Sequence, residues 1–290
     1  FERVCRLAVR GLDALLSYQN YPILAAQLST EKRRPLGVGI INFAYWLAKN
    51  DLNYQHIDAN GLALVDEWAE AWSYYLIKAS ADLAVEFGAP SGNMETKYGH
   101  GITPNQTYKK DLDELVPHVE RMDWDTLRAQ LKDTGIRNST LMALMPAETS
   151  AQIANATNGI EPPRSLISIK QSKHGVLKQV VPEYKRLKNK YDLLWDQKSP
   201  EGYIKIMAVL QKYIDQGISV NTSYNPIYFE DEKIPMSTML QHLLMFYKLG
   251  GKQLYYFNTN DGQGEVDVNK MMGELEVVEV DDENCDGCTI

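Results

Sequence analysis

Four short apolar runs alternate with longer helical segments along this chain, and this alternation restricts the possible folds more than any other feature. The runs cover residues 36–41, 140–145, 218–222 and 254–258. Because helical segments separate them, the order predicts parallel strands joined by crossover helices. A closed barrel of parallel strands needs about eight strands. We therefore expect an α/β sheet that four strands do not close.

Helical spacing of apolar residues predicts the segments between the runs. The expected helices cover residues 4–16, 42–47, 60–87, 182–195, 201–216 and 235–249, and a shorter one is capped by Asp123 and ends at Gly135. Alternating residues on both sides of residues 172–175 predict a β-hairpin. Gly37 and Gly39 lack the third glycine of a dinucleotide-binding fingerprint. We interpret them as a point where backbones pack closely.

The net charge of −8 is concentrated in one part of the sequence. Nine acidic residues and one lysine lie between residues 265 and 290, so this segment carries the whole net charge. We expect residues 261–290 to form a disordered acidic tail, because such segments bury too little apolar surface to fold. The rest of the chain is neutral and has no basic stripe, which argues against binding of polymeric DNA or RNA.

The three cysteines favour a cytoplasmic protein, because they are too few for a secreted disulfide scaffold. Cys5 lies in the first expected helix and is interpreted as a packing residue. Cys285 and Cys288 form one Cys-x-x-Cys pair without a second pair or a nearby histidine, which is a poor zinc site. No run of 18 apolar residues exists, so we expect no membrane-spanning segment.

The second apolar run leads into a turn that is suited to an anion. Pro146 ends the run, and Thr149 and Ser150 follow in the first turn of a short expected helix. Unpaired backbone N–H groups, hydroxyls and the positive end of the helix dipole together favour a bound phosphate. Ordinary N-capping by Thr149 or Ser150 is the alternative reading.

Several long stretches of the sequence resemble the large, catalytic subunit of class I ribonucleotide reductase. They read RNST at residues 137–140, PAETS at 146–150 and NATNGIEPP at 155–163, and the resemblance extends over nearly the whole chain. In that family the matching turn holds the diphosphate of the ribonucleotide substrate. The resemblance thus implies substrate binding by Pro146, Ala147, Glu148, Thr149 and Ser150. It also suggests that Arg164 reaches the nucleotide phosphate or base.

Tyr255 and Tyr256 end the last apolar run. Adjacent aromatic residues are common in strands, so packing explains them without any further role. The family carries a tyrosine pair at this place, which relays an oxidising equivalent from the small subunit to a thiyl-forming cysteine. By this resemblance Tyr256 receives the equivalent at the subunit interface and Tyr255 passes it inward. Such a transfer requires close rings, so we expect the backbone to depart from regular strand geometry here.

The resemblance gives the tail cysteines a role as well. Relatives carry a tail cysteine pair that re-reduces the active site and is itself reduced by thioredoxin or glutaredoxin. Cys285 and Cys288 match that pair in type, although the pair's spacing varies between relatives and the flanking sequence aligns poorly. Nearby acidic residues should raise the thiol pKa values and so oppose reactivity. An incidental pair or half of a metal site remains the alternative.

The family fold is a ten-stranded α/β barrel, and the resemblance implies that this chain supplies its second half. We expect barrel parts at residues 1–94 and 137–260, a small inserted α/β subdomain at 95–136 and the redox tail at 261–290. The thiyl cysteine, the reducing cysteines and the allosteric nucleotide sites of relatives have no match here. We therefore expect an upstream chain as a partner, with the radical supplied by a di-iron small subunit and no cofactor in this chain.

Two other functions stay open at this stage. A non-catalytic fragment would only bind the small subunit, whose C-terminal peptide docks in relatives beside the helix at residues 235–249. One face of this helix carries Met236, Met239, Leu240, Leu243 and Leu244, which we expect to lie mostly in the core, and the resemblance assigns the docking site to a neighbouring face. A stand-alone α/β phosphate-binding enzyme is the second alternative, and it requires a closed barrel.

Overall fold

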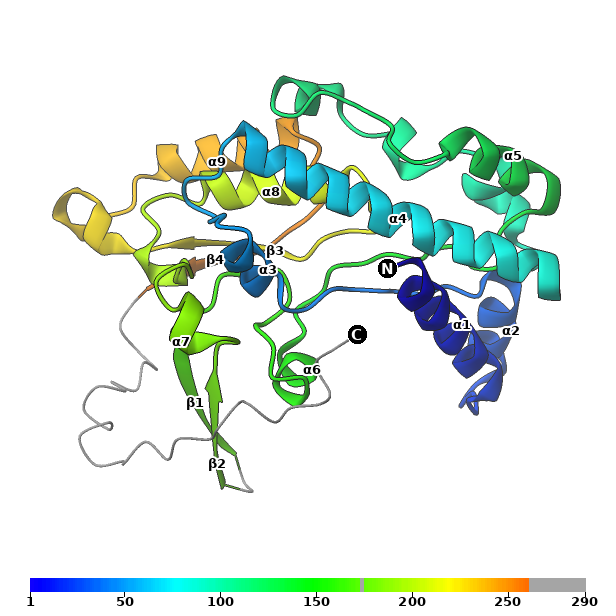
Figure 1. Ribbon diagram of the computed structural model, residues 1–290, viewed down its shortest axis with the longest axis horizontal. Coiled ribbons are helices and arrows are strands. Elements are labelled where there is room, and N and C mark those ends of the chain that lie inside the picture. Colours follow the sequence, from blue (N-terminus) through cyan, green and yellow to red (C-terminus); the bar gives the residue numbers. More distant parts are fainter. Residues whose placement is uncertain (173–174, 261–290) are drawn as a thin grey trace.

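Four extended segments run parallel to one another through the middle of the molecule (Figure 1). The computed structural model describes residues 1–172 and 175–260. Parallel bridges join Val38 to Met142 and Leu144 to Ile218. Beyond them, β3 (Val220–Tyr224) pairs in parallel with β4 (Leu254–Thr259). The neighbours thus follow the order of the sequence, which confirms the predicted parallel α/β arrangement.

The first two segments are less regular than the sequence predicts, because they make isolated bridges instead of continuous strands. Gly39 shows how tightly they approach each other. A Cβ atom on Gly39 would lie 2.7 Å from Sδ of Met145 and 3.1 Å from the carbonyl oxygen of Ala143. Close packing is therefore confirmed at Gly39, whereas a Cβ atom on Gly37 would make only ordinary contacts, the nearest at 3.7 Å from Cβ of Ala143.

Helices cover the sheet and connect its strands. α8 (Glu201–Gln211) and α9 (Met236–Lys248) lead into β3 and β4 respectively. The long α4 (Ala59–Phe87) crosses the molecule and packs against α1 (Glu2–Tyr18), α5 (Trp124–Thr134) and α8 (Figure 1). The main hydrophobic core lies between these helices and the sheet. Within the described residues no helix has the length and apolar character needed to cross a membrane.

The remaining helices are short. They are α2 (Leu24–Arg33), α3 (Phe43–Lys49), α6 (Glu148–Ile153) and α7 (Tyr184–Leu187). The prediction of a long helix at residues 182–195 is wrong, since only α7 and a single 3-10 turn form there. The hydroxyl of Tyr191 donates to the carbonyl of Pro182 at 2.8 Å and bends this stretch back on itself. α2 has no buried residue, and the sequence did not indicate it.

The predicted hairpin is present between the central turn and α7. β1 (Ile167–Ser172) pairs antiparallel with β2 (Gly175–Val180), and the register joins Ile167 to Val180.

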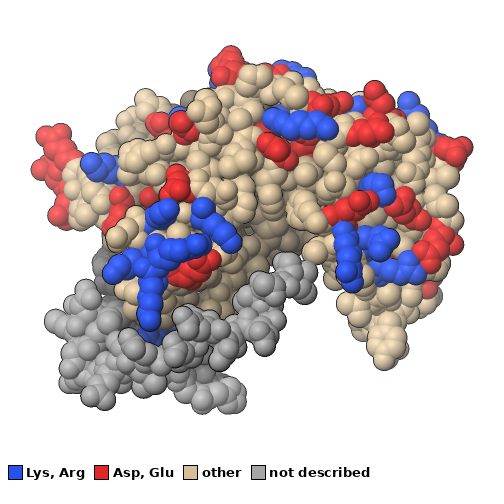
Figure 2. All heavy atoms as spheres, viewed as in Figure 1, with Lys and Arg blue, Asp and Glu red and all other residues tan. Residues whose placement is uncertain are grey.

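Basic side chains gather over α7 on the face in Figure 2, whereas elsewhere on that face both signs of charge are mixed. The predicted acidic tail at residues 261–290 lies outside the described residues.

Residues 95–136 contain 3-10 turns and α5 but no strand, so the expected β content of this segment is wrong. Its backbone is held by local turns and side-chain caps, as sequences rich in Gly, Pro and Asn permit. Asp123 caps α5 as predicted, because its carboxylate accepts from the backbone N–H of Thr126 at 3.2 Å. Gly135 ends α5 with a φ of 77°. The division of the chain into four parts stays a prediction.

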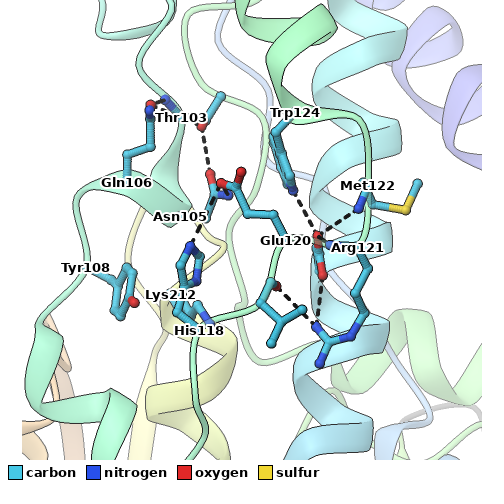
Figure 3. A network of polar contacts seen from close by, with 12 residues as sticks. Thr103, Asn105, Gln106, Tyr108, His118, Glu120, Arg121, Met122, Trp124 and Lys212 are labelled. Atoms are coloured by element: carbon cyan, nitrogen blue, oxygen red, sulfur yellow. Dashed lines mark hydrogen bonds and ion pairs between the residues drawn. The ribbon is translucent and has the colours of Figure 1, made fainter.

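A buried ionic network anchors this segment to α4 (Figure 3). Glu70 is almost fully buried and accepts from the backbone N–H groups of Arg121 and Met122 and from the indole N–H of Trp124 at 2.9 Å. Asp66 accepts from Lys212 at 2.8 Å and from Arg121 at 3.0 Å. Because the two buried carboxylates each have several donors, the network stabilises one arrangement of α4, α8 and the segment.

Candidate functional site

The predicted phosphate turn lies at the carboxyl edge of the parallel segments. It begins directly after the segment that is bridged through Leu144, and it leads into α6. Parallel α/β sheets bind ligands at this edge, because the loops that follow the strands meet there. Asn42 braces the edge from the neighbouring segment. Its backbone N–H donates to the carbonyl of Thr157 at 2.9 Å, and its Oδ1 accepts from the N–H of Thr157 at 3.0 Å.

The geometry of the turn leaves its polar groups facing outward. α6 begins at Glu148 with Ala147 as the N-cap, and no side chain caps it, so N-capping by Thr149 or Ser150 does not account for their presence. Both side chains are exposed. Their backbone N–H groups have no acceptor among the described residues. They are open donors at the start of a helix, as a bound anion requires.

A cavity of about 140 Å³ lies beside the turn and brings two of the predicted substrate residues together. Glu148 and Arg164 both line it, along with Asn158 and Glu161. Pro146 lines a smaller adjoining hollow that Asn158 and Glu161 also border. Thr149 and Ser150 line neither space and lie on the outer side of the same helical turn.

Tyr255 and Tyr256 lie side by side, as the sequence predicts for a relay. The register places Val220 opposite Leu254 but Asn221 opposite Tyr256, so Tyr255 is the additional residue of a β-bulge. The bulge replaces the alternation of a regular strand, and the two ring centroids lie 4.2 Å apart with planes inclined by 56°. The expected departure from regular strand geometry is therefore confirmed.

The pair is exposed on the described surface. Tyr255 is 48% exposed, Tyr256 is 54% exposed, and the next residue, Phe257, is exposed to a similar extent. A hydrogen bond with the Tyr255 hydroxyl raises the pKa of Tyr256 above the usual value for a tyrosine. Three consecutive half-exposed aromatic residues in one strand form an apolar surface patch, whereas packing in the core of this chain would bury them.

Sequence reasoning missed Asn221, which connects the bulge to the turn region. Its Oδ1 accepts from the backbone N–H of Tyr256 at 3.1 Å, and its Nδ2 donates to the carboxylate of Glu161. Burial raises the pKa of Glu161, while the hydrogen bond from Asn221 and the charge of Arg164 lower it. The charged residue in NGIEPP, placed between apolar and proline residues, was the available signal for Glu161. Nothing in the sequence marked Asn221.

Comparison with known proteins identifies the family to which this chain belongs. The sequence model of the ribonucleotide reductase barrel domain matches residues 1–257. The chain belongs to the ribonucleotide reductase family. It is 55% identical over 259 residues to the ribonucleoside-diphosphate reductase subunit alpha of Haemophilus influenzae, with 89% of this chain and 34% of the relative covered.

Two other relatives extend this similarity. The ribonucleoside-diphosphate reductase 1 subunit alpha of Escherichia coli is 52% identical over 247 residues, which cover 85% of this chain and 32% of the relative. The subunit alpha of Enterobacteria phage T4 is 42% identical over 289 residues, which cover 99% of this chain and 37% of the relative. The chain therefore spans about a third of the length of the curated relatives it matches.

Two further predicted features of this ribonucleotide reductase chain have different outcomes. The face of α9 is not core, contrary to the main sequence expectation, because Met236, Leu240 and Leu244 are 76%, 51% and 57% exposed. His242 and Phe246 make the core contacts of α9 instead. Cys5 is buried, as predicted for a packing residue, and burial raises its pKa to about 11. Cys285 and Cys288 lie outside the described residues.

Proposed function

We propose that this chain provides part of a class I ribonucleoside-diphosphate reductase large subunit, which reduces ribonucleotides to deoxyribonucleotides by radical chemistry. The paired rings of Tyr255 and Tyr256 are the observation that carries the proposal. Their bulge is not needed for a strand that merely packs, and it costs β4 part of its regular ladder. Their exposure suits a site that receives an oxidising equivalent from another subunit.

The substrate diphosphate binds at the turn of residues 146–150. The open N–H groups of Thr149 and Ser150 and their hydroxyls donate to the phosphate oxygens, and the helix dipole adds a partial positive charge. Arg164 lines the adjoining cavity and supplies the full positive charge that this site needs. Glu148, on the same cavity wall, is suited to accept hydrogen bonds from a ribose or base. Pro146 and Ala147 shape the backbone that leads into α6.

Tyr256 receives the oxidising equivalent and Tyr255 passes it toward a thiyl-forming cysteine. A cysteine in this role, and the pair that reduces the ribose, come from an upstream part of the large subunit. The radical originates in a di-iron small subunit, and the upstream part also binds the allosteric nucleotides. This chain holds no metal or organic cofactor of its own in the proposal. Residues 1–94 and 137–260 contribute half of a ten-stranded barrel, with 95–136 as an insertion.

Cys285 and Cys288 act as the dithiol that re-reduces the active site after each turnover, and thioredoxin or glutaredoxin then reduces them. The match to the phage relative covers 99% of this chain and therefore extends into the tail region. Replacing both cysteines with serine should block repeated turnover with thioredoxin, while a small dithiol restores it by direct access. Equal turnover of both forms with thioredoxin would contradict the assignment.

The exposed face of α9 docks the small subunit, and its exposure favours that role. The same observation favours the second candidate function, a non-catalytic fragment that binds and regulates the small subunit. Both candidates place the protein in the cytoplasm, without membrane or polymeric nucleic acid as a partner. They differ in whether ribonucleotide is reduced.

The deciding experiment combines three proteins and a labelled ribonucleoside diphosphate. This chain is mixed with the upstream part of a large subunit, a radical-bearing small subunit and a dithiol, and labelled deoxyribonucleotide is measured. Product that requires all three proteins supports the catalytic function. Binding of the small subunit without product, although the upstream part and the small subunit are active with the corresponding C-terminal part of a relative, favours the non-catalytic fragment.

A further inference from the structure

A chain of side chains runs between the backbone of the tyrosine pair and the backbone of the phosphate turn. From the pair, the N–H of Tyr256 donates to Oδ1 of Asn221 at 3.1 Å, and Nδ2 of Asn221 donates to Oε1 of Glu161. From the turn, the N–H of Ala147 donates to Oδ1 of Asn158 at 3.0 Å. Nδ2 of Asn158 then donates to Oε2 of Glu161 at 3.5 Å. The two branches thus meet at the two oxygens of one carboxylate.

The chemistry of the groups determines the direction of every bond. An ionised carboxylate accepts hydrogen bonds but donates none. Asn158 and Asn221 therefore both turn their NH₂ groups toward Glu161, which leaves each amide oxygen free to accept from a backbone N–H. Each of these N–H groups belongs to a proposed functional segment: the substrate turn at one end and the relay pair at the other.

The surroundings make Glu161 responsive to what the turn binds. Its carboxylate is largely buried, and it borders the cavity that Glu148 and Arg164 line. The positive charge of Arg164 favours ionised Glu161, and the negative charge of Glu148 opposes it. A diphosphate held at the turn beside this cavity would engage Arg164 and add negative charge, and both changes alter the interaction of Glu161 with its two amide donors.

We propose that Asn158, Glu161 and Asn221 are positioning residues that couple the substrate turn to the radical-relay pair. The link rests on the proposed function, since it assigns a partner to each end of the same site. Asn158 holds the turn and Asn221 holds the bulge. Glu161 fixes the positions of these two segments relative to each other. None of the three residues needs to contact the reacting atoms.

Kinetics of the reconstituted enzyme should separate the two branches. Asn158→Ala should raise KM for the ribonucleoside diphosphate about tenfold with little change in kcat, since it frees the turn only. Asn221→Ala should lower kcat about tenfold with little change in KM, since it releases the bulge. Glu161→Gln should affect both, because its NH₂ group faces one of the two amide donors and only one bond is retained.

Asn105→Ala is the matched control. Like the two asparagines of the link, Asn105 donates to a carboxylate, that of Glu120, at 2.8 Å, although Asn105 is buried and the other two are half-buried. It belongs to the segment at residues 95–136 and not to the link. Its replacement should lower the unfolding midpoint without changing kcat or KM. If the three link variants behave as Asn105→Ala does while the wild type turns over, the link is overturned and the proposed function stands.

Hydrogen exchange tests the link without catalysis. Amide exchange of the full chain is measured with and without inorganic pyrophosphate. Pyrophosphate should change the exchange of the Tyr256 amide in the wild type, and Glu161→Gln should abolish that change while preserving the change at Ala147. Identical exchange at Tyr256 with and without pyrophosphate overturns the link. Absence of ribonucleotide reduction by the wild type, together with coupled exchange, would instead remove the proposed function and leave the physical link in place.

Discussion

The network around α4 buries its charged groups, whereas the strand β4 exposes its aromatic side chains. Asp66 and Glu70 are almost fully buried, and each accepts several hydrogen bonds from this chain. Tyr255 and Tyr256 are about half exposed and make their closest ring contact with each other. The first region satisfies its own charges and fixes the scaffold. The second leaves two phenol groups accessible, as the proposed contact with another subunit requires.

The largest expected effect is a loss of stability when the buried network around α4 is disrupted. Glu70→Ala leaves two backbone N–H groups and the indole N–H of Trp124 without an acceptor. The free energy of unfolding should fall by about 3–5 kcal/mol, which is typical when one partner of a buried charged cluster is removed. Urea unfolding followed by circular dichroism measures it.

Glu86→Ala is the control for that experiment. Glu86 pairs with Arg10 at the surface, where both side chains are about half exposed. Solvent screens such pairs, so the midpoint should stay close to that of the wild type. Equal shifts for the two variants would show that the network around α4 is not a special source of stability.

A smaller effect is expected at the exposed turn. Thr149→Val and Ser150→Ala remove donors that face the proposed phosphate, and a hydrogen bond to a charged group contributes about 1.5–3 kcal/mol. Ribonucleotide affinity should fall, whereas the unfolding midpoint should hardly change because both side chains are exposed. Calorimetric titration of the reconstituted enzyme tests this. Thr126→Val, in the first turn of α5, is the matched control that should bind normally.

The exposed face of α9 offers a comparable test of partner binding. Leu240→Asp and Leu244→Asp place a charge where we expect apolar contact, and burial of one leucine contributes about 1.5–3 kcal/mol. Affinity for the small subunit should fall, while the free chain keeps its stability because both leucines are exposed. Unchanged affinity, measured by surface plasmon resonance, would remove α9 from the interface.

The smallest expected effect depends on pH and concerns the buried side of α9. Burial lowers the pKa of His242 below its usual 6.5, although Glu201 partly opposes this. The unfolded chain therefore takes up the proton first as pH falls through 6.5, and stability should decrease below that value. His242 Nδ1 also lies 3.1 Å from the Tyr224 hydroxyl. His242→Gln should flatten this dependence; an unchanged slope would assign it to other groups.

Periodicity and caps predicted much of the scaffold, because they depend on neighbours in sequence. α4, α5 with its cap at Asp123, the hairpin and the parallel order all follow from local patterns. The failures arise from contacts between distant residues. The bond from Tyr191 to Pro182 disrupts an expected helix, and α9 turns outward the face that its periodicity suggested for the core.

The site was predicted unevenly for the same reason. The turn was predicted from its own residues and from a family resemblance, the role of Tyr255 and Tyr256 from the resemblance alone, and the irregular strand from the need for close rings. The sequence could not predict the contacts of Asn221, since they involve a backbone N–H in β4 and a carboxylate that lies 60 residues away in the sequence. Arg164 and Glu148 line one cavity to which residues of α6 and of the hairpin also contribute, and no local pattern encodes this arrangement.

Turnover of the reconstituted enzyme with Tyr256→Phe tests the relay most directly. The change removes one exposed hydroxyl, so folding and ribonucleotide affinity should match the wild type, and Tyr228→Phe should behave as the wild type in every respect. Turnover should be lost for Tyr256→Phe and likewise for Tyr255→Phe, because phenylalanine cannot carry the oxidising equivalent. Turnover close to that of the wild type in either variant would contradict the relay and assign the pair to packing.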